Sequence, residues 1–265
     1  EFIQMGIEAL INIGFKEFRA NINNRKLLSG IIQFAGASEK EFIPICISID
    51  KLPKIGREMV KKELIEKRKI SPEISDKILD VITLTGKTEE LLTKLKKQLV
   101  NVPIAMEAIN ELEIIFDYFK TIKLDKKFYR FTPFIARGLA YYTGPVWEFE
   151  ILEGDVGSVA GCGRYDNIIG KFIGKEVAAT GGSFGIERLV EVIKSRKMIN
   201  ISSTIAKALV TIFDKSLFNN SLIIADQLRK NNISTILYPV PTEKLDKQLK
   251  YANKKNIPYV IIIGP

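Results

Sequence analysis

The spacing of hydrophobic residues predicts a mixed first part, a helical middle and an alternating end for this 265-residue chain. Residues 1–14 carry apolar side chains at helical intervals and end at a glycine, so we expect an amphipathic helix there. The apolar positions of this helix are Phe2, Met5, Ala9, Leu10 and Ile13. Residues 15–22 alternate in part and predict a strand, and Asn23 or Asn24 can cap a helix that runs to about residue 35.

Residues 36–127 are predicted to be mostly helical. Residues 43–49 are rich in isoleucine, and this composition can be mistaken for that of a strand. Further helices are expected to begin near Pro53, at Pro72 with Ser71 as cap, at Thr88 and at Pro103. The charge-rich helices over 57–69 and 87–97 have faces that suit either RNA phosphates or solvent.

The next part of the chain predicts a series of strands. Residues 128–134 are rich in aromatic side chains and predict one strand. Residues 146–151 alternate apolar and acidic side chains as a half-buried strand does. Residues 156–163 and 180–185 are dense in glycine, which in strands marks close approach of a ligand or of another backbone. A helical pattern begins at Ile186.

Three arginines flank these bare strands, namely Arg137, Arg164 and Arg188. A guanidinium group pairs with phosphate or carboxylate and stacks on flat rings, so the combination suits a flat, anionic ligand such as a nucleotide. The hydroxyls of Tyr141 and Tyr142 can select a polar side chain. The alternative is that the glycines serve packing and the arginines are solvated.

The last 60 residues alternate strands and helices. Strands are expected over 206–213, 233–238 and 259–263, with helices over 216–230 and 243–256. Apolar strands separated by helices predict βαβ units and a parallel sheet. A Gly-x-Gly-x-x-Gly fingerprint is absent from the first turn, which argues against a dinucleotide-binding fold. The polar, unpatterned residues 198–204 are expected to be a linker.

Composition narrows the function classes. The net charge is +9, and residues 194–265 hold 12 basic and 4 acidic residues, which leaves the rest of the chain near neutral. This basic end favours a polyanionic partner, with a merely soluble surface as the alternative. The chain has no histidine, which excludes a Ser-His-Asp arrangement and a His-ligated metal within it. Apolar runs are too short for a membrane span, and the first residues given do not show the basic-plus-apolar pattern of a secretion signal. Two distant cysteines predict neither a disulfide framework nor a metal site, so we expect the reducing cytoplasm.

Three segments resemble motifs of one enzyme family. Residues 137–144, Arg-Gly-Leu-Ala-Tyr-Tyr-Thr-Gly, are similar to the histidine-specific signature of histidyl-tRNA synthetases. Residues 161–166, Gly-Cys-Gly-Arg-Tyr-Asp, resemble the Gly-Gly-Gly-Arg-Tyr-Asp strand of that family, and residues 181–188 resemble class II motif 3. The resemblance implies an α+β class II core with an antiparallel sheet and a helical insertion, followed by an α/β anticodon-binding domain.

The resemblance also implies a domain order. The expected parts are catalytic core (1–36), helical insertion (37–127), catalytic core (128–198), linker (199–205) and a truncated anticodon-binding domain (206–265). In the family, motifs 1 and 2 precede this region, and neither is recognisable in the sequence. We therefore expect that the sequence either is a fragment or lacks an upstream portion, and that the chain is inactive by itself.

Roles are carried over only where residues match. The resemblance implies catalytic roles for Arg137 and Arg188. For histidine binding it implies Arg137, Tyr141, Tyr142, Gly161 and Gly163. For ATP binding it implies Arg137, Gly185, Glu187 and Arg188. It implies structural roles for Arg164, Tyr165 and Asp166.

The implied function is that of a histidine–tRNA ligase with ATP as cosubstrate and with Mg²⁺ bound to ATP without a protein ligand site. The implied partners are histidine, tRNA(His) and a second copy in a cytoplasmic homodimer. Ala140 and Cys162 depart from the aspartate and glycine usual in the family, so two alternatives stay open. They are the synthetase-like regulatory subunit of ATP phosphoribosyltransferase and a non-catalytic RNA-binding relative.

Overall fold

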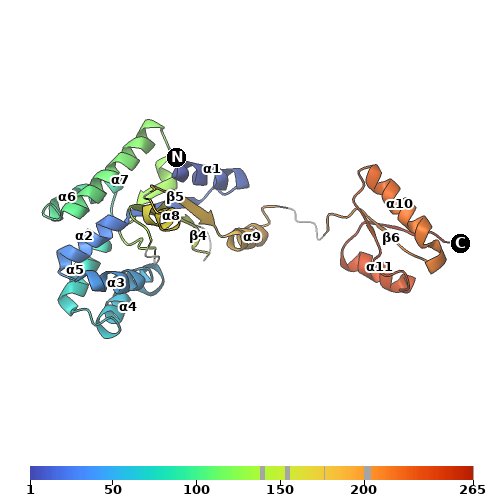
Figure 1. Ribbon diagram of the computed structural model, residues 1–265, viewed down its shortest axis with the longest axis horizontal. Coiled ribbons are helices and arrows are strands. Elements are labelled where there is room, and N and C mark those ends of the chain that lie inside the picture. The colour runs from blue at the N-terminus through green and yellow to red at the C-terminus, as the bar shows by residue number, and fades with distance from the viewer. Residues whose placement is uncertain (138–140, 153–155, 176, 200–203, 265) are drawn as a thin grey trace. The chain divides into compact units, whose positions relative to one another are not determined.

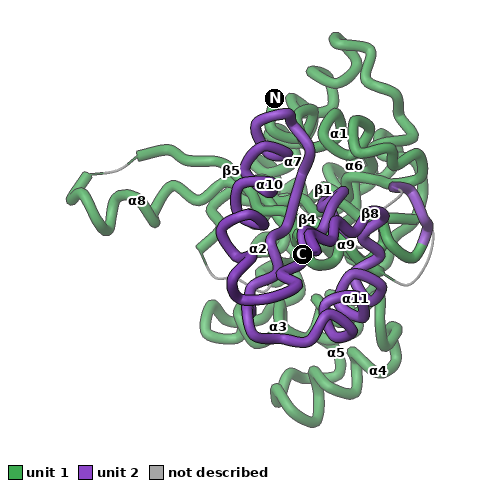
Figure 2. The backbone as a smooth tube through the Cα atoms, turned by 90° about the vertical axis from the view of Figure 1, so that its right-hand side faces the viewer, with its two compact units in different colours: residues 1–195 green, residues 196–265 purple. Residues whose placement is uncertain are grey.

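The computed structural model describes residues 1–137, 141–152, 156–175, 177–199 and 204–264. The chain forms two compact units, residues 1–195 and residues 196–265, whose elements are labelled in Figure 1 and which Figure 2 draws in two colours. Each unit has its own sheet and its own core. In the described part of the chain, every helix is too short or too polar to cross a lipid bilayer.

The first unit is built on a five-stranded sheet with the order β2-β1-β3-β4-β5. Its strands are β1 (Phe18–Asn24), β2 (Tyr129–Phe131), β3 (Pro145–Ile151), β4 (Ser158–Arg164) and β5 (Thr180–Phe184). All neighbouring pairs are antiparallel except β1 and β2, which run parallel. A parallel pair needs a long crossover, and the helical middle of the chain supplies it. Strand β2 is shorter than the segment 128–134 expected for it.

The two faces of this sheet differ in chemistry, because residues paired across neighbouring strands point to the same side. One paired row consists of Arg130, Asn21, Glu148, Gly161 and Ser183. We call this polar, glycine-bearing side the site face. The adjacent row, Ile22, Trp147, Cys162 and Gly182, lies on the opposite side, which we call the apolar face.

Helix α1 (Phe2–Ile13) covers part of the apolar face and ends at Gly14 in the left-handed conformation. The helix was predicted correctly, but its predicted buried face was wrong. Phe2 is 45% exposed and Met5 is 59% exposed, whereas Ile3, Gly6, Ile7 and Leu10 are buried. The reason is a close approach: a Cβ atom on Gly6 would lie 2.5 Å from Cε2 of Phe149, so the glycine side of the helix meets the sheet.

The helical middle was predicted well, including its caps. The helices are α2 (Arg25–Ala35), α3 (Phe42–Ile49), α4 (Leu52–Glu66), α5 (Pro72–Ile82), α6 (Thr88–Gln98) and α7 (Pro103–Thr121). The side chain of Asn24 accepts a hydrogen bond from the Lys26 amide at the start of α2, and Ser71 accepts one from the Ile74 amide in α5. Helix α7 packs against α2, where Gly30 lies against Ala105.

Helix α8 (Asp166–Ile173) was not predicted from the sequence. None of its residues is buried, and Phe172 is 85% exposed. Figure 2 shows α8 extending away from the rest of the first unit. A two-turn segment is too short for hydrophobic spacing to separate a helix from a strand. Helix α9 (Ile186–Ser195) follows β5, as expected.

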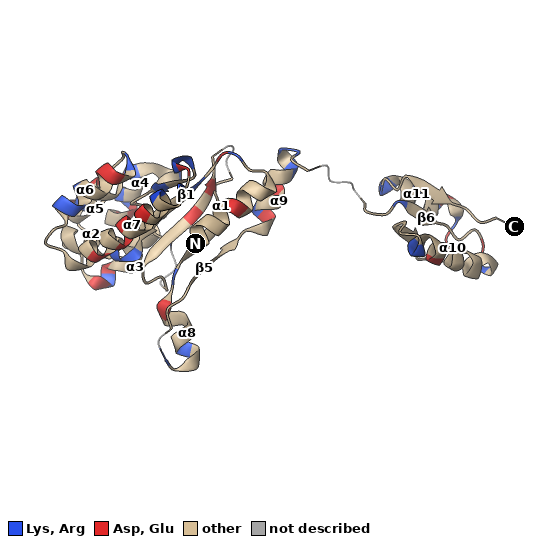
Figure 3. Ribbon diagram, turned by 90° about the horizontal axis from the view of Figure 1, so that it is seen from above, with Lys and Arg blue, Asp and Glu red and all other residues tan. Residues whose placement is uncertain are grey.

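The second unit has a three-stranded sheet with the order β7-β6-β8. Its elements are β6 (Ala208–Val210), α10 (Phe218–Lys230), β7 (Thr235–Leu237), α11 (Leu245–Lys254) and β8 (Tyr259–Ile261). Both strand pairs are parallel, which confirms the βαβ prediction. The Gln248 side chain is fully buried and bonds both the amide and the carbonyl of Ile212, which ties α11 to the sheet. Figure 3 shows lysines and arginines on α10 and α11.

Candidate functional site

Arg137 lies flat on the bare strand β4. Its backbone has φ 44°, a left-handed value unusual for a residue with a side chain. A Cβ atom on Gly161 would lie 2.9 Å from Nη1 of Arg137 and closer still to the rest of the guanidinium group. The glycine at 161 is therefore what allows Arg137 to occupy the site face.

Glu148 on β3 holds the guanidinium group from the side. Nη1 of Arg137 donates a hydrogen bond of 3.2 Å to Oε2 of Glu148. Burial raises the pKa of the Glu148 carboxyl, and the charge of Arg137 opposes that rise. Glu148 was not among the residues expected in the site. The available signal was an acidic residue in an alternating strand opposite a glycine-rich one.

Of the two tyrosines of the signature, Tyr142 interacts with this arginine, and Tyr141 packs against Tyr142. A Cβ atom on Gly163 would lie 2.5 Å from the Tyr142 ring, so this ring too rests on bare backbone. The Tyr141 hydroxyl donates a hydrogen bond of 3.2 Å to the Tyr142 hydroxyl, and the ring centroids are 4.4 Å apart. Burial, followed by the neighbouring Tyr141, raises the pKa of Tyr142 to about 12. Tyr142 is therefore a neutral hydrogen-bonding group at physiological pH.

A pocket of about 250 Å³ opens between β4, β5 and the start of α9. It is lined by Arg137, Ser158, Val159, Ala160, Gly161, Ser183, Phe184, Gly185 and Arg188. Four of the expected site residues thus meet here, namely Arg137, Gly161, Gly185 and Arg188. Arg188 donates a hydrogen bond of 2.6 Å to the Ser158 carbonyl. Glu187, which was expected to orient Arg188, is exposed and does not line the pocket.

Asp166 connects the end of β4 to neighbouring segments through hydrogen bonds. Its carboxylate accepts hydrogen bonds from Nε of Arg164 at 2.9 Å, from the Thr143 hydroxyl at 3.1 Å and from the Ala179 amide at 3.1 Å. Burial raises the pKa of Asp166, but these bonds outweigh it and the net shift is downward. The contacts suit the structural role predicted for Arg164, Tyr165 and Asp166.

The two departures from the family motifs have different outcomes. Ala140 lies outside the described residues. Cys162 is buried on the apolar face, away from Arg137, and its sulfur lies against Gly182. Burial raises the pKa of the Cys162 thiol to about 11, so the group is a protonated packing residue rather than a nucleophile.

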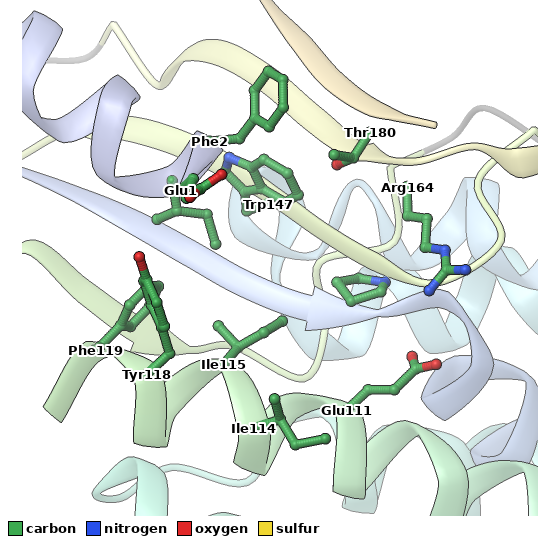
Figure 4. Close-up of a pocket in the computed structure, with 12 residues that line it drawn as sticks. Glu1, Phe2, Glu111, Ile114, Ile115, Tyr118, Phe119, Trp147, Arg164 and Thr180 are labelled. Carbon is green, nitrogen blue, oxygen red and sulfur yellow. The ribbon is translucent and has the colours of Figure 1, made fainter. Parts of the chain in front are cut away.

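A larger pocket of about 560 Å³ lies at the apolar face between α1 and α7 (Figure 4). Its lining is mainly apolar and includes Phe2, Ile115, Tyr118 and Trp147. Arg164, for which a structural role was expected, lines this pocket, but none of the residues expected to bind substrate does. We therefore place the candidate site in the smaller pocket on the site face. Among the described residues, no cluster of three or more Cys, Asp or Glu side chains is placed to hold a metal ion.

Two protein-family models match the chain. The family model for histidyl-tRNA synthetase matches residues 1–189. The chain belongs to the histidyl-tRNA synthetase family. A second family model, the anticodon binding domain, matches residues 204–265. The class II core with an α/β anticodon-binding domain after it is therefore confirmed, with a mixed rather than a purely antiparallel sheet.

Individual relatives give the same assignment. Histidine–tRNA ligase of Cytophaga hutchinsonii is 37% identical over 265 residues, which cover 100% of this chain and 58% of that protein. The cytoplasmic ligase of rice is 34% identical, with 100% of this chain and 34% of that protein covered. This chain thus spans less than two thirds of the length of these relatives.

Solved structures extend the comparison to the fold. Histidyl-tRNA synthetase from Nostoc sp. PCC 7120 matches with a TM-score of 0.71 and 31% identity, over 99% of this chain and 62% of that one. An ATP phosphoribosyltransferase regulatory subunit/histidyl-tRNA synthetase from Bacillus halodurans C has a TM-score of 0.68 at 19% identity, over 98% of this chain and 63% of that one. At that identity the second likeness shows the shared fold alone.

Proposed function

We propose that the protein carrying this chain is a histidine–tRNA ligase that works in two steps. A carboxylate oxygen of histidine attacks the α-phosphorus of ATP, and the bond to pyrophosphate breaks. A hydroxyl of the terminal ribose of tRNA(His) then attacks the histidyl carbonyl carbon, and AMP leaves with the bonding electrons. ATP is the cosubstrate, and Mg²⁺ accompanies its phosphates.

The observation that carries this proposal is the meeting of Arg137 and Arg188 in one pocket floored by bare strands. Negative charge develops on the α-phosphate during attack, and fixed guanidinium groups stabilise that charge without reorganisation. Glycine backbone admits a flat nucleotide close to the sheet. Arg137 would contact the α-phosphate and the substrate carboxylate, and Arg188 would stack on adenine and reach the phosphates. Gly185 and Glu187 would complete the ATP-binding side.

The tyrosine pair supports histidine as the amino acid. The Tyr142 ring is buried, and its hydroxyl is neutral and close to that of Tyr141. A buried hydroxyl that bonds an imidazole rejects an apolar competitor, because the competitor would leave the hydroxyl unpaired. Gly163 makes room for the ring, and Gly161 for the arginine beside it.

The second unit supports a tRNA partner. Residues 194–265 carry 12 basic and 4 acidic side chains, which suits a polyanion. In this proposal residues 37–127 form the insertion near the acceptor arm, residues 199–205 are the linker and residues 206–265 bind the anticodon region. The protein would act as a cytoplasmic homodimer. The match of residues 204–265 to the anticodon binding domain favours a ligase over the regulatory alternative.

The test is amino-acid-dependent exchange between ATP and pyrophosphate. Because the chain covers 58% of the C. hutchinsonii ligase, we would assay the chain itself and a hybrid in which it replaces the matching part of that ligase. We expect exchange by the hybrid with histidine only, a strong reduction of exchange in the Arg137→Ala hybrid, and no exchange by the chain alone. A wild-type hybrid that binds histidine in a calorimeter without any exchange would favour the regulatory relative instead.

A further inference from the structure

We infer that Glu148 is a positioning residue that fixes the Arg137 guanidinium group over the site face and, through Ser158, also fixes Arg188. The inference rests on the proposed function, since it gives these arginines their task. It adds to that function a carboxylate and a hydroxyl that the family signature does not point to.

Few contacts hold the Arg137 side chain. Its left-handed backbone turns the side chain back onto β4, where Gly161 offers a flat surface but no side chain. Its Nε is buried without a hydrogen-bond partner. Within the described part of the chain, Glu148 is the one carboxylate paired with this arginine. The guanidinium group is therefore oriented by the Glu148 carboxylate, with the Tyr142 hydroxyl as a second neighbour.

Ser158 connects the surroundings of the two arginines. The hydroxyl of Ser158 donates a hydrogen bond of 3.1 Å to the Ala160 carbonyl and also interacts with the Glu148 carboxylate. The carbonyl of the same Ser158 accepts the hydrogen bond from Arg188. Contacts thus link Arg137, Glu148, Ser158 and Arg188 in series, and all of these residues except Glu148 line the pocket.

Glu148 also affects the net charge of the pocket. Glu148 partly neutralises Arg137, so its removal makes the pocket more positive while it frees the guanidinium group to rotate. Binding of the ATP ground state would then not weaken, because it responds mainly to charge. The chemical step would slow, because it depends on orientation, and a misplacement of about 1 Å can cost on the order of 100-fold in rate.

Strand β3 offers a matched control two residues further on. Glu150 has the same side chain and lies on the same face, but it accepts a hydrogen bond from Asn21 and pairs with Arg130 at 3.5 Å instead. Glu150→Gln therefore removes one carboxylate charge from the same strand and face without touching the contacts of Arg137.

The kinetic test measures kcat and KM for ATP in histidine-dependent exchange by the hybrid protein. We expect kcat of Glu148→Ala to fall about 10- to 100-fold with KM for ATP no higher than in the wild type. Glu148→Gln should recover part of the loss, because its amide oxygen still accepts a bond from Arg137. Equal losses in Glu150→Gln, a rise in KM with unchanged kcat, or a change of less than twofold in Glu148→Ala would overturn the inference.

The second test needs no catalysis and uses the complete 265-residue chain. Nitrogen-15 spectra report rotation of the Arg137 guanidinium group, with Arg137→Lys used to assign its signals. We expect separate, slowly exchanging Nη signals in the wild type and in Glu150→Gln, and averaged signals in Glu148→Ala. Identical spectra for wild type and Glu148→Ala would overturn the inference. If the wild-type hybrid shows no histidine-dependent exchange, the proposed function fails, and these spectra alone decide the role of Glu148.

Discussion

Replacing Gly161 by alanine tests the geometry of the site with the smallest possible change. The new methyl group would lie 2.9 Å from Nη1 of Arg137 and closer to Cζ and Nη2. Ordinary contacts between heavy atoms begin at about 3.5 Å, so the guanidinium group must retreat by about 1 Å or more. The backbone itself accepts alanine, because Gly161 is not among the glycines with positive φ.

The magnitude follows from that displacement. A shift of about 1 Å in a charge-stabilising group costs on the order of 100-fold in rate, which corresponds to about 2.7 kcal/mol of transition-state stabilisation. Folding should respond in the other direction, because glycine inside a strand is less favourable than alanine by roughly 0.5–1 kcal/mol. We therefore expect Gly161→Ala to lower activity sharply and to leave the free energy of unfolding unchanged or slightly higher.

The assay measures histidine-dependent pyrophosphate exchange and urea unfolding of the hybrid protein. Both are measured in the wild-type and Arg137→Ala backgrounds. If the methyl group acts by displacing Arg137, Gly161→Ala has little further effect once the arginine is gone, and the double-mutant cycle shows strong coupling. An equal loss in both backgrounds would mean that Gly161 serves something other than Arg137. Near wild-type activity in the single variant would refute the packing argument outright.

Three further outcomes are expected. Asp166→Asn should lower the free energy of unfolding by about 1–2 kcal/mol near pH 7, because charge-assisted bonds from Arg164 and Thr143 are weakened. The folded-state pKa of Asp166 is depressed, so this stabilisation exists above the unfolded-state pKa of about 3.9 and is lost as pH falls through the folded value. A difference between the two proteins that does not shrink as pH falls below about 3.9 would contradict this expectation. Tyr142→Phe should raise KM for histidine by about 10-fold or more with KM for ATP unchanged, and a parallel rise in both would argue against a histidine pocket. Binding of tRNA(His) through the basic residues 194–265 should weaken about 10- to 100-fold between about 50 and 200 mM KCl, as about three or four phosphate contacts require, and a flat salt dependence measured by filter binding would count against that surface.

The sequence was most informative where one residue type has one physical use. Glycines at 161, 163 and 185 marked the floor of the site, because glycine weakens a strand and is kept there when a neighbouring group must approach the bare backbone. Asn24 and Ser71 cap the helices they were expected to cap, because a side-chain oxygen before a helical pattern satisfies its first free amides. The alternation of residues 146–151 correctly predicted a strand with one buried side.

The sequence did not predict the features that depend on contacts between residues distant along the chain. The buried side of α1 depends on the ring of Phe149, which is distant along the chain and packs where Gly6 has no side chain. Glu148 became a site residue only when the register placed it beside Gly161 and within reach of Arg137. The parallel pairing of β1 and β2 likewise depends on how far the helical middle carries the chain.

Helix α8 has a consequence for the dynamics of the region beside the site. A helix as short as α8 is marginal in water unless packing supports it, and α8 buries none of its residues. Its amide hydrogens should therefore exchange with solvent far faster than those of β4, which is paired on both sides within the sheet. The boundary lies at Asp166, where hydrogen bonds from Arg164, Thr143 and Ala179 close the end of the strand. Local opening of α8 can thus stop at this residue and leave the glycine floor beneath Arg137 closed.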